Sequence, residues 1–365
     1  MRAVVLPPVR MPAIIDRAPR DIKRPRLRSK SNGRAPAPPN SEDALKSTDV
    51  LMPAPMMPLV MDEVGRSFTL HRADAGGLDA LVGEVGARIR GIAAGGHARI
   101  DGALMDKLPK LEIVSSFGVG YDHVDAAEAG RRGIVVTNTP DVLTDEVADL
   151  ALGLLLSTVR RLPQSERYLR AGKWLEKPFP LTATLRGRTV GILGLGRIGK
   201  AIATRLEAFG LAVAYHGRRR QDDVAYRYYG SLVEMARAVD VLMVVTPGGA
   251  ETNRIVNAEV LAALGPEGVL VNVARGTVVD EPALIRALTD GTILAAGLDV
   301  FEEEPKVPAA LIALDNAVLL PHVGSASVHT RNAMGQLVVD NLRAWFEGKG
   351  PLTPVAETPW PRVPA

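Results

Sequence analysis

The sequence contains no cysteine and no long hydrophobic run, and each absence excludes a class of protein. Without cysteine the chain cannot form disulfides, bind a metal through thiolates or use a thiol as a nucleophile. A membrane-spanning helix needs about 20 consecutive apolar residues, whereas the longest apolar run, near Leu150–Leu156, is far shorter. We therefore expect no membrane contact and no metal site, and the composition fits a reducing, cytoplasmic setting.

Most of the excess positive charge lies at the beginning of the chain. The formal net charge is +3, but residues 1–48 alone contain eleven Lys or Arg and four Asp or Glu, so the rest is net acidic. The same segment contains eight prolines and little periodic apolar pattern, which predicts a disordered basic tail over residues 1–47. It lacks the apolar core of a secretory signal, and its prolines oppose the helix of a mitochondrial presequence. Contact of this tail with nucleic acid is the alternative to a plain unstructured extension.

Beyond the tail, strand-like and helix-like patterns alternate in two series. The first series contains apolar strands predicted at Thr48–Met52, Ser67–Leu70, Gly91–Ala93, Glu112–Ser115 and Ile134–Thr137. The second series contains six, predicted at Val190–Leu193, Ala212–Tyr215, Val241–Val245, Val269–Val273, Ala295–Asp299 and Ala317–Leu320. This alternation predicts an α/β protein with two doubly wound parallel sheets. Six strands is also the number in a complete dinucleotide-binding domain.

The longer helical patterns indicate how the domains are divided. They are predicted at Leu78–Ile89, Asp145–Arg161 and Val328–Phe346. The last of these is too short to form a domain, so we expect it to return to the first sheet. We predict a smaller, discontinuous, flavodoxin-like substrate-binding domain over residues 48–139 and 324–355, and a Rossmann-type cofactor domain over residues 140–323.

A glycine-rich turn follows the first strand of the second series. Gly194, Gly196 and Gly199 form a GxGxxG pattern that opens a helix running to about Phe209. In such turns the first glycine permits the tight bend, the second allows a pyrophosphate to approach the backbone, and the third allows the helix to pack closely on the strand. A purely structural turn is the alternative, but six predicted strands around it favour dinucleotide binding.

The loop after the next strand indicates which dinucleotide is bound. NAD-binding versions carry an acidic residue there, which holds the ribose 2′-hydroxyl. Here the strand ends in Tyr215-His216-Gly217 and is followed by Arg218–Arg220, with no carboxylate to repel a 2′-phosphate. Guanidinium groups bind phosphate well, so we predict NADPH rather than NADH. A solvated basic loop is the alternative.

Two residues late in the chain suggest chemistry on a keto acid. Arg275 follows a predicted strand, at the edge where such sheets bind ligands, and a guanidinium can pair with a carboxylate and polarise the adjacent carbonyl. His322 also follows a strand and precedes a loop of small residues, and imidazole is the usual proton donor near neutral pH. Each residue alone would more often be structural.

Three adjacent glutamates lie between that arginine and that histidine. They are Glu302, Glu303 and Glu304, in a turn closed by Pro305. A carboxylate bonded to the histidine would fix its tautomer and favour its protonated form. The spacing does not distinguish among the three glutamates, and a run of this kind is usually a solvated loop.

Five motifs in order resemble the D-isomer-specific 2-hydroxyacid dehydrogenase family over roughly Thr48–Val355. They are FGVGYDHVD, GILGLGRIGK, VNVARGTVVDE, GLDVFEEEP and LLPHVGSAS. The resemblance implies Arg275 as the substrate-binding arginine and His322 as the acid/base, and it selects Glu304 as the partner of the histidine. It also implies that the backbone of Val119 and Gly120 receives the substrate carboxylate. Finally, it implies a homodimer in which the helix region Asp145–Arg161 embraces the partner.

With this resemblance the predicted contacts are complete. Substrate contacts are predicted at Val119, Gly120, Arg275, His322 and Ser325. Cofactor contacts are predicted at Gly194, Leu195, Gly196, Arg197, Ile198, Gly199, Arg218, Arg219, Thr246, Thr252, Val273, Ala274, Asp299 and Gly324.

Within the family, the chain looks most similar to NADPH-preferring glyoxylate/hydroxypyruvate reductases and hydroxyphenylpyruvate reductases. The shared stretches are TNTPDVLTDEVADLA, the basic loop after the second strand, and EEPKVPAALIALDNAVLLPHVGSAS. A 2-ketogluconate reductase is an alternative, because residues facing the substrate beyond its third carbon cannot be placed. Met52–Met57 and Trp174 are candidates for that role. A formate-type dehydrogenase fits less well, and a nucleotide-sensing protein like the corepressors of this fold is the non-enzymatic alternative.

Overall fold

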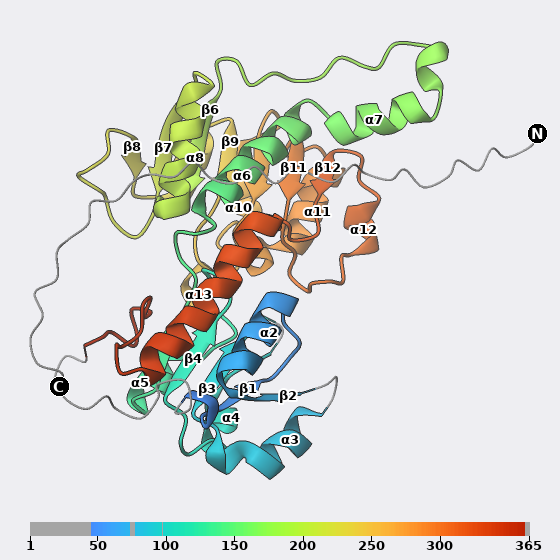
Figure 1. The fold of residues 1–365 in the computed structure, drawn as a ribbon. Helices are drawn as coiled ribbons and strands as arrows, with labels where there is room; N and C mark the ends of the chain where they lie inside the picture. Colours follow the sequence, from blue (N-terminus) through green and yellow to red (C-terminus); the bar gives the residue numbers. More distant parts are fainter. Residues whose placement is uncertain (1–44, 74–76, 97, 362–365) are drawn as a thin grey trace, which may run out of the picture. The chain divides into compact units, whose positions relative to one another are not determined.

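The described strands of the protein form two parallel sheets, and Figure 1 labels most of these strands. The structure is a computed structural model and describes residues 45–73, 77–96 and 98–361. Every pairing between the labelled strands is parallel, so the predicted α/β class is confirmed. None of the helices in these ranges combines the length and the apolar character that crossing a bilayer requires.

The first sheet contains five strands in the order β2-β1-β3-β4-β5. They are β1 (Asp49–Met52), β2 (Thr69–Arg72), β3 (Gly91–Ala94), β4 (Ile113–Ser116) and β5 (Val135–Thr137). Four of the five predicted strands agree to within a residue at either end. The prediction of Ser67–Leu70 was two residues early, because a helix continues through Ser67 and the N–H of Phe68 still donates to the Val64 carbonyl.

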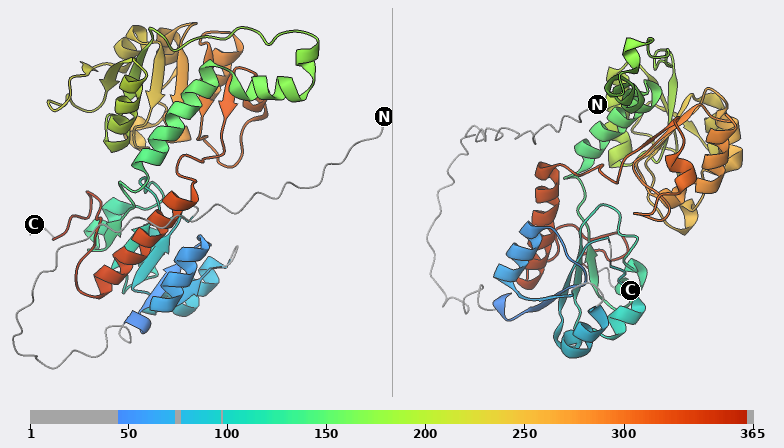
Figure 2. Two further views of the ribbon diagram at one scale, coloured as in Figure 1. Left: turned by 45° about the horizontal axis from the view of Figure 1, so that its top comes forward. Right: turned by 90° about the vertical axis from the view of Figure 1, so that its right-hand side faces the viewer.

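Helices cover both faces of this sheet. Those from the first half of the chain are α2 (Pro58–Ser67), α3 (Leu78–Val85), η1 (Gly86–Arg88), α4 (Gly102–Asp106) and α5 (Ala126–Arg131). The last helix, α13 (Val328–Phe346), lies beside α2 and packs on β3 and β4 (Figure 2). The hydroxyl of Ser115 in β4 donates to the carbonyl of Val338 at 3.0 Å in this buried contact. The predicted return of the final helix to the first sheet is thereby confirmed.

After α13 the chain runs along the edge of the first sheet. Pro354 forms an antiparallel bridge with Thr137, and the N–H of Val355 donates to Val136 at 2.9 Å. We call residues 352–358 the C-terminal segment. It covers β5, which would otherwise leave its outer hydrogen-bonding groups unpaired.

The second sheet contains seven strands in the order β12-β11-β10-β9-β6-β7-β8. They are β6 (Thr189–Leu193), β7 (Ala212–His216), β8 (Arg227–Tyr229), β9 (Val241–Val244), β10 (Val269–Asn272), β11 (Ala295–Leu298) and β12 (Ala317–Leu319). Six match the predicted strands, whereas β8 was not predicted. Its sequence Arg-Tyr-Tyr lacks an aliphatic run, and the strand is stabilised instead by packing such as that of Tyr228 on Tyr215, with ring centroids 5.2 Å apart.

Apolar cores lie on both faces of the second sheet. One core includes Leu154 of α6 (Thr144–Val159) and Ile202 of α8 (Arg197–Ala208). The other includes Met235 of α9 (Leu232–Ala238), Val260 of α10 (Ala258–Leu264) and Leu284 of α11 (Glu281–Thr289). The helices and turns of this region are α6 (Thr144–Val159), α7 (Leu162–Arg170), η2 (Lys173–Leu175), α8 (Arg197–Ala208), α9 (Leu232–Ala238), η3 (Ala250–Thr252), α10 (Ala258–Leu264), η4 (Gly276–Val278), α11 (Glu281–Thr289) and α12 (Ala309–Ile312). The arrangement is the doubly wound one that the sequence predicts.

Two predictions about boundaries need comment. The helix predicted at Asp145–Arg161 ends at Val159, because Arg161 adopts a left-handed φ of 50° and begins the unpredicted helix α7. Of the predicted tail, residues 1–44 lie outside the described residues, but Leu45 is 7% exposed and belongs to the first core. The packed chain therefore includes residues that the prediction assigned to the tail. The domain boundaries themselves stay predictions.

Candidate active site

The glycine turn after β6 is shaped by close backbone contacts. Gly194 has a φ of 99°, and a Cβ there would lie 2.7 Å from the Cα of Thr246. A Cβ on Gly199 would lie 2.3 Å from the carbonyl oxygen of Gly194, so neither position accepts a side chain. A Cβ on Gly196 would meet no described atom within 4 Å. The middle glycine thus borders open space at the N-terminus of α8, as pyrophosphate binding requires.

The basic loop Arg218–Arg220 is attached to this turn. The side-chain amide of Gln221 donates to the carbonyl of Leu195 at 2.7 Å, and its backbone N–H donates to the hydroxyl of Tyr215 at 2.7 Å. The three arginines are exposed and make no side-chain hydrogen bond or ion pair with the described part of the chain. Cations that can pair with a 2′-phosphate therefore lie next to the glycine turn.

The loop that carries Arg275 is held by a buried asparagine. Asn272, 1% exposed, accepts from the N–H of Ala274 and donates to the carbonyl of Arg275, both at 3.0 Å. A Cβ on Gly276 would lie 1.8 Å from the carbonyl carbon of Phe301, so only glycine allows the loop to pack there. These contacts place the arginine at the carboxyl end of β10, as predicted.

The guanidinium of Arg275 is already paired on one side. Its Nε donates to Asp122 Oδ2 at 2.7 Å, and its Nη1 donates to the carbonyl of Ala274 at 2.7 Å. A Cβ on Gly120 would lie 1.6 Å from Nη2, so that atom lies against the predicted carboxylate-binding backbone. The side chain is one-third exposed.

The loop Phe117–Tyr121, which we call the carboxylate loop, presents unpaired donors. The N–H of Gly118 donates to the hydroxyl of Thr139, and the carbonyl of Val119 accepts from the Asn138 side chain at 2.8 Å. By contrast, the N–H groups of Val119 and Gly120 donate to no group in the described ranges. Two adjacent free amides can bind a carboxylate.

His322 and Glu304 form the pair that the resemblance implied. The Nδ1 of His322 lies 2.7 Å from Glu304 Oε2, and the N–H of Phe301 donates to Oε1 at 3.0 Å. Burial opposes ionisation of Glu304, but these hydrogen bonds and the nearby positive charges hold its pKa below the ordinary value. Since the carboxylate only accepts, Nδ1 carries the hydrogen. Nε2 makes no hydrogen bond within the described residues, and the side chain is 47% exposed.

The backbone around this histidine is itself constrained. His322 has a φ of 53°, the left-handed region that non-glycine residues rarely adopt. The next two N–H groups, of Val323 and Gly324, donate to the carboxylate of Asp299 at 2.7 and 2.8 Å. Burial raises the pKa of Asp299, although both amides oppose the shift. Asp299 therefore fixes the loop that orients the imidazole.

The other glutamates of the run have different surroundings. Glu302 accepts from Arg254 Nη2 at 2.6 Å, and Glu303 is exposed and its side chain makes no hydrogen bond or ion pair within the described residues. Glu304 is thus the member of the run that meets the histidine.

The remaining predicted contacts are distributed around the same strand ends. Thr246 borders Gly194, Val273 and Ala274 follow β10, and Ser325 is 9% exposed beside Gly324. Thr252 lies farther along its loop in η3, where its hydroxyl donates to Pro247. Arg197 of the glycine turn is mostly exposed and pairs with Asp141. The roles of these residues stay predictions.

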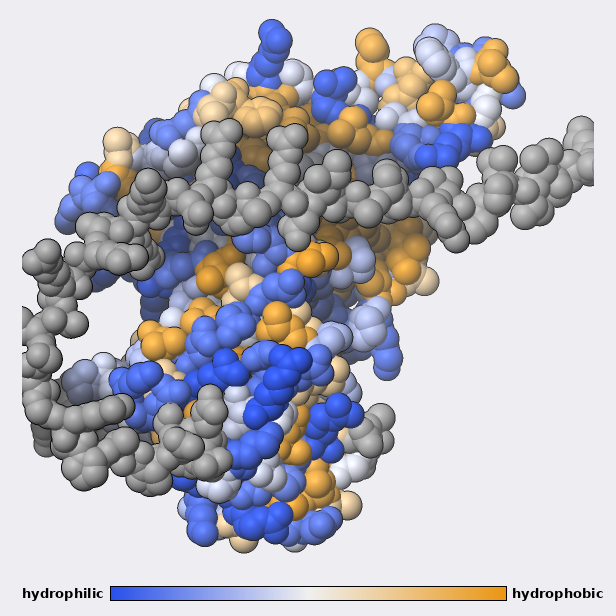
Figure 3. Space-filling model, viewed as in Figure 1, coloured by the Kyte–Doolittle hydropathy of each residue, from blue (hydrophilic) through white to orange (hydrophobic). Residues whose placement is uncertain are grey.

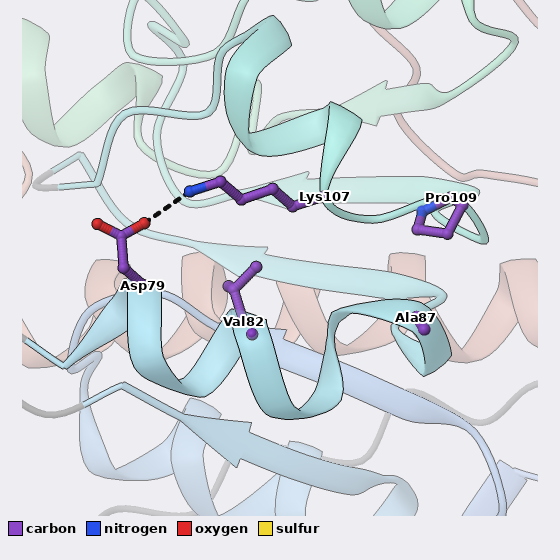
Figure 4. Close-up of a pocket in the computed structure, with 6 residues that line it drawn as sticks. Asp79, Val82, Ala87, Lys107 and Pro109 are labelled. Atoms are coloured by element: carbon purple, nitrogen blue, oxygen red, sulfur yellow. Dashed lines mark hydrogen bonds and ion pairs between the residues drawn. The ribbon is translucent and has the colours of Figure 1, made fainter.

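One surface cavity lies away from these residues. It measures about 540 Å³ and is lined by residues of α3, η1 and the turn before β4 (Figure 4). Lys107 and Asp79 form an ion pair of 2.8 Å across it, and the rest of its lining is apolar or backbone. It contains none of the predicted site residues.

Comparison with known proteins decides the family. Residues 152–324 match the model of the D-isomer specific 2-hydroxyacid dehydrogenase NAD binding domain. The chain is 49% identical over 313 residues to a hydroxyphenylpyruvate reductase of Plectranthus scutellarioides, covering 85% of this chain and all of the relative. It is equally similar to a glyoxylate/hydroxypyruvate reductase A of Arabidopsis thaliana, 49% identical over 312 residues with the same coverage. The chain belongs to the D-isomer specific 2-hydroxyacid dehydrogenase family.

A solved structure extends the similarity to three dimensions. An NADPH-dependent glyoxylate/hydroxypyruvate reductase from Sinorhizobium meliloti, in complex with NADP and malonate, is 55% identical and matches with a TM-score of 0.82. The match covers 87% of this chain and 99% of the other. This 2-hydroxyacid dehydrogenase is therefore an oxidoreductase that acts on CH–OH donors and their 2-keto acids.

Three residues of the dehydrogenase site were not predicted. Asp122 lies in the FGVGYDHVD motif and Asn272 in VNVARG, so both belong to motifs that were recognised. The sequence alone does not indicate that Asp122 pairs with Arg275 or that Asn272 holds the loop of Arg275. Arg331 in α13 lies over the ring of Phe117, 5.5 Å from its centroid. Burial lowers the pKa of Arg331, with the charge of Asp299 opposing the shift. Arg331 lies about one turn after the start of α13 and belongs to none of the recognised motifs, so the sequence did not single it out.

Proposed function

We propose that this enzyme reduces a small 2-keto acid of the glyoxylate or hydroxypyruvate type to the D-2-hydroxy acid, using NADPH. The observation that carries the proposal is the pairing of His322 with Glu304 at 2.7 Å, which leaves Nε2 available beside a strand-end cofactor site. When bound, the reduced nicotinamide supplies the hydride. The names of the relatives support the choice of substrate class.

The residues divide the remaining work as follows. Arg275 pairs with the substrate carboxylate through its terminal Nη nitrogens, and the backbone N–H groups of Val119 and Gly120 donate to the same carboxylate. Protonated His322 donates the Nε2 proton to the carbonyl oxygen as hydride reaches the carbonyl carbon. Glu304 holds the imidazole in the tautomer required and stabilises its positive charge. The oxidised cofactor and the hydroxy acid leave, and a proton from solvent restores His322.

The basic loop supports the choice of NADPH. Arg218 and Arg219 lie beside the glycine turn without anionic partners in the described chain, whereas an acid that would hold a ribose hydroxyl is missing at the end of β7. The solved relative named above is NADPH-dependent.

The test is a panel of keto acids with both cofactors. Glyoxylate, hydroxypyruvate, hydroxyphenylpyruvate and 2-ketogluconate are ranked by kcat/KM, with NADPH and then NADH. We expect glyoxylate and hydroxypyruvate to rank first and NADPH to be preferred. No turnover of any acid would favour the sensing protein over the enzyme, and equal use of both cofactors would contradict the role of the basic loop.

We also propose that two copies associate through the region after α6. Exposed apolar side chains gather there, in α7 and the residues that follow, and Figure 3 shows apolar residues among charged ones in that region. They are Leu162, Leu169, Trp174, Leu175 and Leu181, with exposures from 48% to 101%. Changing Leu175 and Leu181 to aspartate should shift the protein from dimer to monomer in sedimentation, whereas Leu352→Asp, at an apolar residue elsewhere that is 53% exposed, should not.

A further inference from the structure

The carboxylate loop is held by residues more than 200 positions further along the chain. The hydroxyl of Tyr121, at one end of the loop, donates to Glu357 Oε2 at 2.9 Å. Burial and this carboxylate raise the pKa of Tyr121 to about 12, so its hydroxyl keeps its proton. Glu357 belongs to the C-terminal segment, which carries none of the residues predicted to react or to bind cofactor.

A second connection runs through Asn138. Its backbone N–H donates to the carbonyl of Thr353, and its carbonyl accepts from the Thr353 hydroxyl at 2.6 Å. Its side chain then donates to the carbonyl of Val119 at 2.8 Å. Thr353 therefore holds the backbone of Asn138, and the side chain of Asn138 in turn fixes the peptide between Val119 and Gly120. Since a peptide is planar, fixing its carbonyl also fixes the direction of the Gly120 N–H.

The C-terminal segment is itself firmly anchored. The hydroxyl of Thr358, 5% exposed, accepts from the N–H of Val136 and donates to its carbonyl. Asn341 of α13, fully buried, accepts from the N–H groups of Leu352 and Thr353. Figure 1 shows this segment beside α5, where a Cβ on Gly130 would lie 2.7 Å from the Glu357 carbonyl. Because the C-terminal segment is attached at so many points, it can hold the carboxylate loop in a fixed position.

We propose that the C-terminal segment is a positioning element for the carboxylate loop, and that Thr353 and Glu357 set the enzyme's affinity for the carboxylate of its substrate. The inference rests on the proposed role of the Val119 and Gly120 amides. The simpler reading, that the segment only covers the edge strand β5, predicts effects on stability alone. The two readings differ in what happens to substrate affinity when single contacts to the loop are removed.

The first experiment removes each contact separately. Tyr121→Phe and Glu357→Ala each remove the hydrogen bond between Tyr121 and Glu357, and Thr353→Val removes the hydrogen bonds of the Thr353 hydroxyl with Asn138 and Asn341. Each variant should raise KM for glyoxylate by about threefold to tenfold. Both kcat and KM for NADPH should stay within about twofold of the parent. Leu352→Ala is the matched control, because it lies in the same segment with its side chain half exposed. Changed unfolding temperatures with unchanged KM would overturn the inference.

The second experiment tests the route through Asn138. Asn138→Ala should raise KM for glyoxylate by about tenfold, and adding Thr353→Val should raise it little further, because both act on the same peptide. Effects of the two changes that simply multiply would show that Thr353 does not act through Asn138, and would overturn that step.

A third measurement does not depend on turnover. Hydrogen exchange of peptides covering residues 117–121 should be faster in Thr353→Val than in the parent, with Leu352→Ala unchanged. Unchanged exchange would overturn the positioning role whatever the kinetics show. Faster exchange together with unchanged KM would show that the C-terminal segment positions the loop but that the loop does not bind the substrate carboxylate. That result would contradict the role proposed above for the Val119 and Gly120 amides.

Discussion

Charged groups are arranged in opposite ways at the two predicted binding regions. Near the glycine turn, Arg218–Arg220 are exposed and unpaired within the described chain. At the proposed reaction centre, Arg275 is paired with Asp122 and His322 with Glu304. Paired groups hold one geometry before a ligand arrives, whereas free arginines gain most when the ligand itself brings the anion. The first arrangement suits selection of a cofactor and the second suits proton transfer.

The largest effect should come from the reaction centre. His322→Ala removes the proposed acid, so kcat should fall by about 10²–10⁴-fold, with KM for NADPH little changed. His329→Ala, at an exposed histidine seven residues later, is the control and should keep normal turnover. Near-normal kcat in His322→Ala would show that the pairing with Glu304 is structural only.

The partner of the histidine should come next. Glu304→Gln keeps the shape but replaces an ionic hydrogen bond, which is worth about 1.5–3 kcal/mol, so kcat should fall by about 10- to 100-fold. Glu303→Gln, at the exposed neighbour, should behave like the parent in the same steady-state assay. A loss of the same size in both variants would mean that the site senses the charge of the whole run.

Removing the arginines of the basic loop should affect binding of NADPH, which has a 2′-phosphate, and not binding of NADH. Changing Arg218 and Arg219 together to alanine should raise KM for NADPH by about tenfold or more while leaving that for NADH unchanged, because one charge-assisted contact is worth at least the ~1.4 kcal/mol of a tenfold change. The double change of Arg237 and Arg286, exposed on α9 and α11, removes the same net charge at a distance. If it raises KM for NADPH equally, the arginine loop acts only through the overall field.

The smallest effect should appear in stability against pH. The pKa of Glu304 is lower in the folded protein than its ordinary value of 4.5, so the unfolded chain binds more protons between the two values and stability rises with pH there. The stabilisation by ionised Glu304 is complete above the ordinary value and is lost as pH falls through the folded one. In urea unfolding, the difference between the parent and Glu304→Gln should therefore shrink as the pH is lowered from about 6 to about 4. A difference that stays constant or grows would contradict this assignment.

What could be predicted from the sequence depended on how local each signal was. The strands of both sheets were recognised because buried parallel strands are short aliphatic runs, and α13 was predicted with its observed ends. Strand β8 and helix α7 were missed because their residues are mainly polar, charged or tyrosine, without a clear apolar pattern, and their structure comes from packing on distant elements. In the same way the glycine turn has a local pattern, whereas nothing local says that Asp122 meets Arg275.

The run of three glutamates shows the same limit at the site. Its members are adjacent and chemically identical, so spacing favoured none of them. In the structure, Glu302 is paired with Arg254, and the turn places Glu304 against His322. Which carboxylate serves the histidine is a property of the folded turn, and only the family resemblance anticipated it.

The long-range contacts of the first sheet have a consequence for how the enzyme is made. This sheet is the first to leave the ribosome, yet one of its faces is covered by α13 and its edge by the C-terminal segment. Domains generally fold as soon as their residues emerge, but this one also needs α13 and the C-terminal segment, which are synthesised after the whole second sheet. A chain terminated just before residue 352 would contain every proposed catalytic residue and still lack a finished carboxylate loop. Completion of the substrate site thus depends on synthesis of the C-terminal segment.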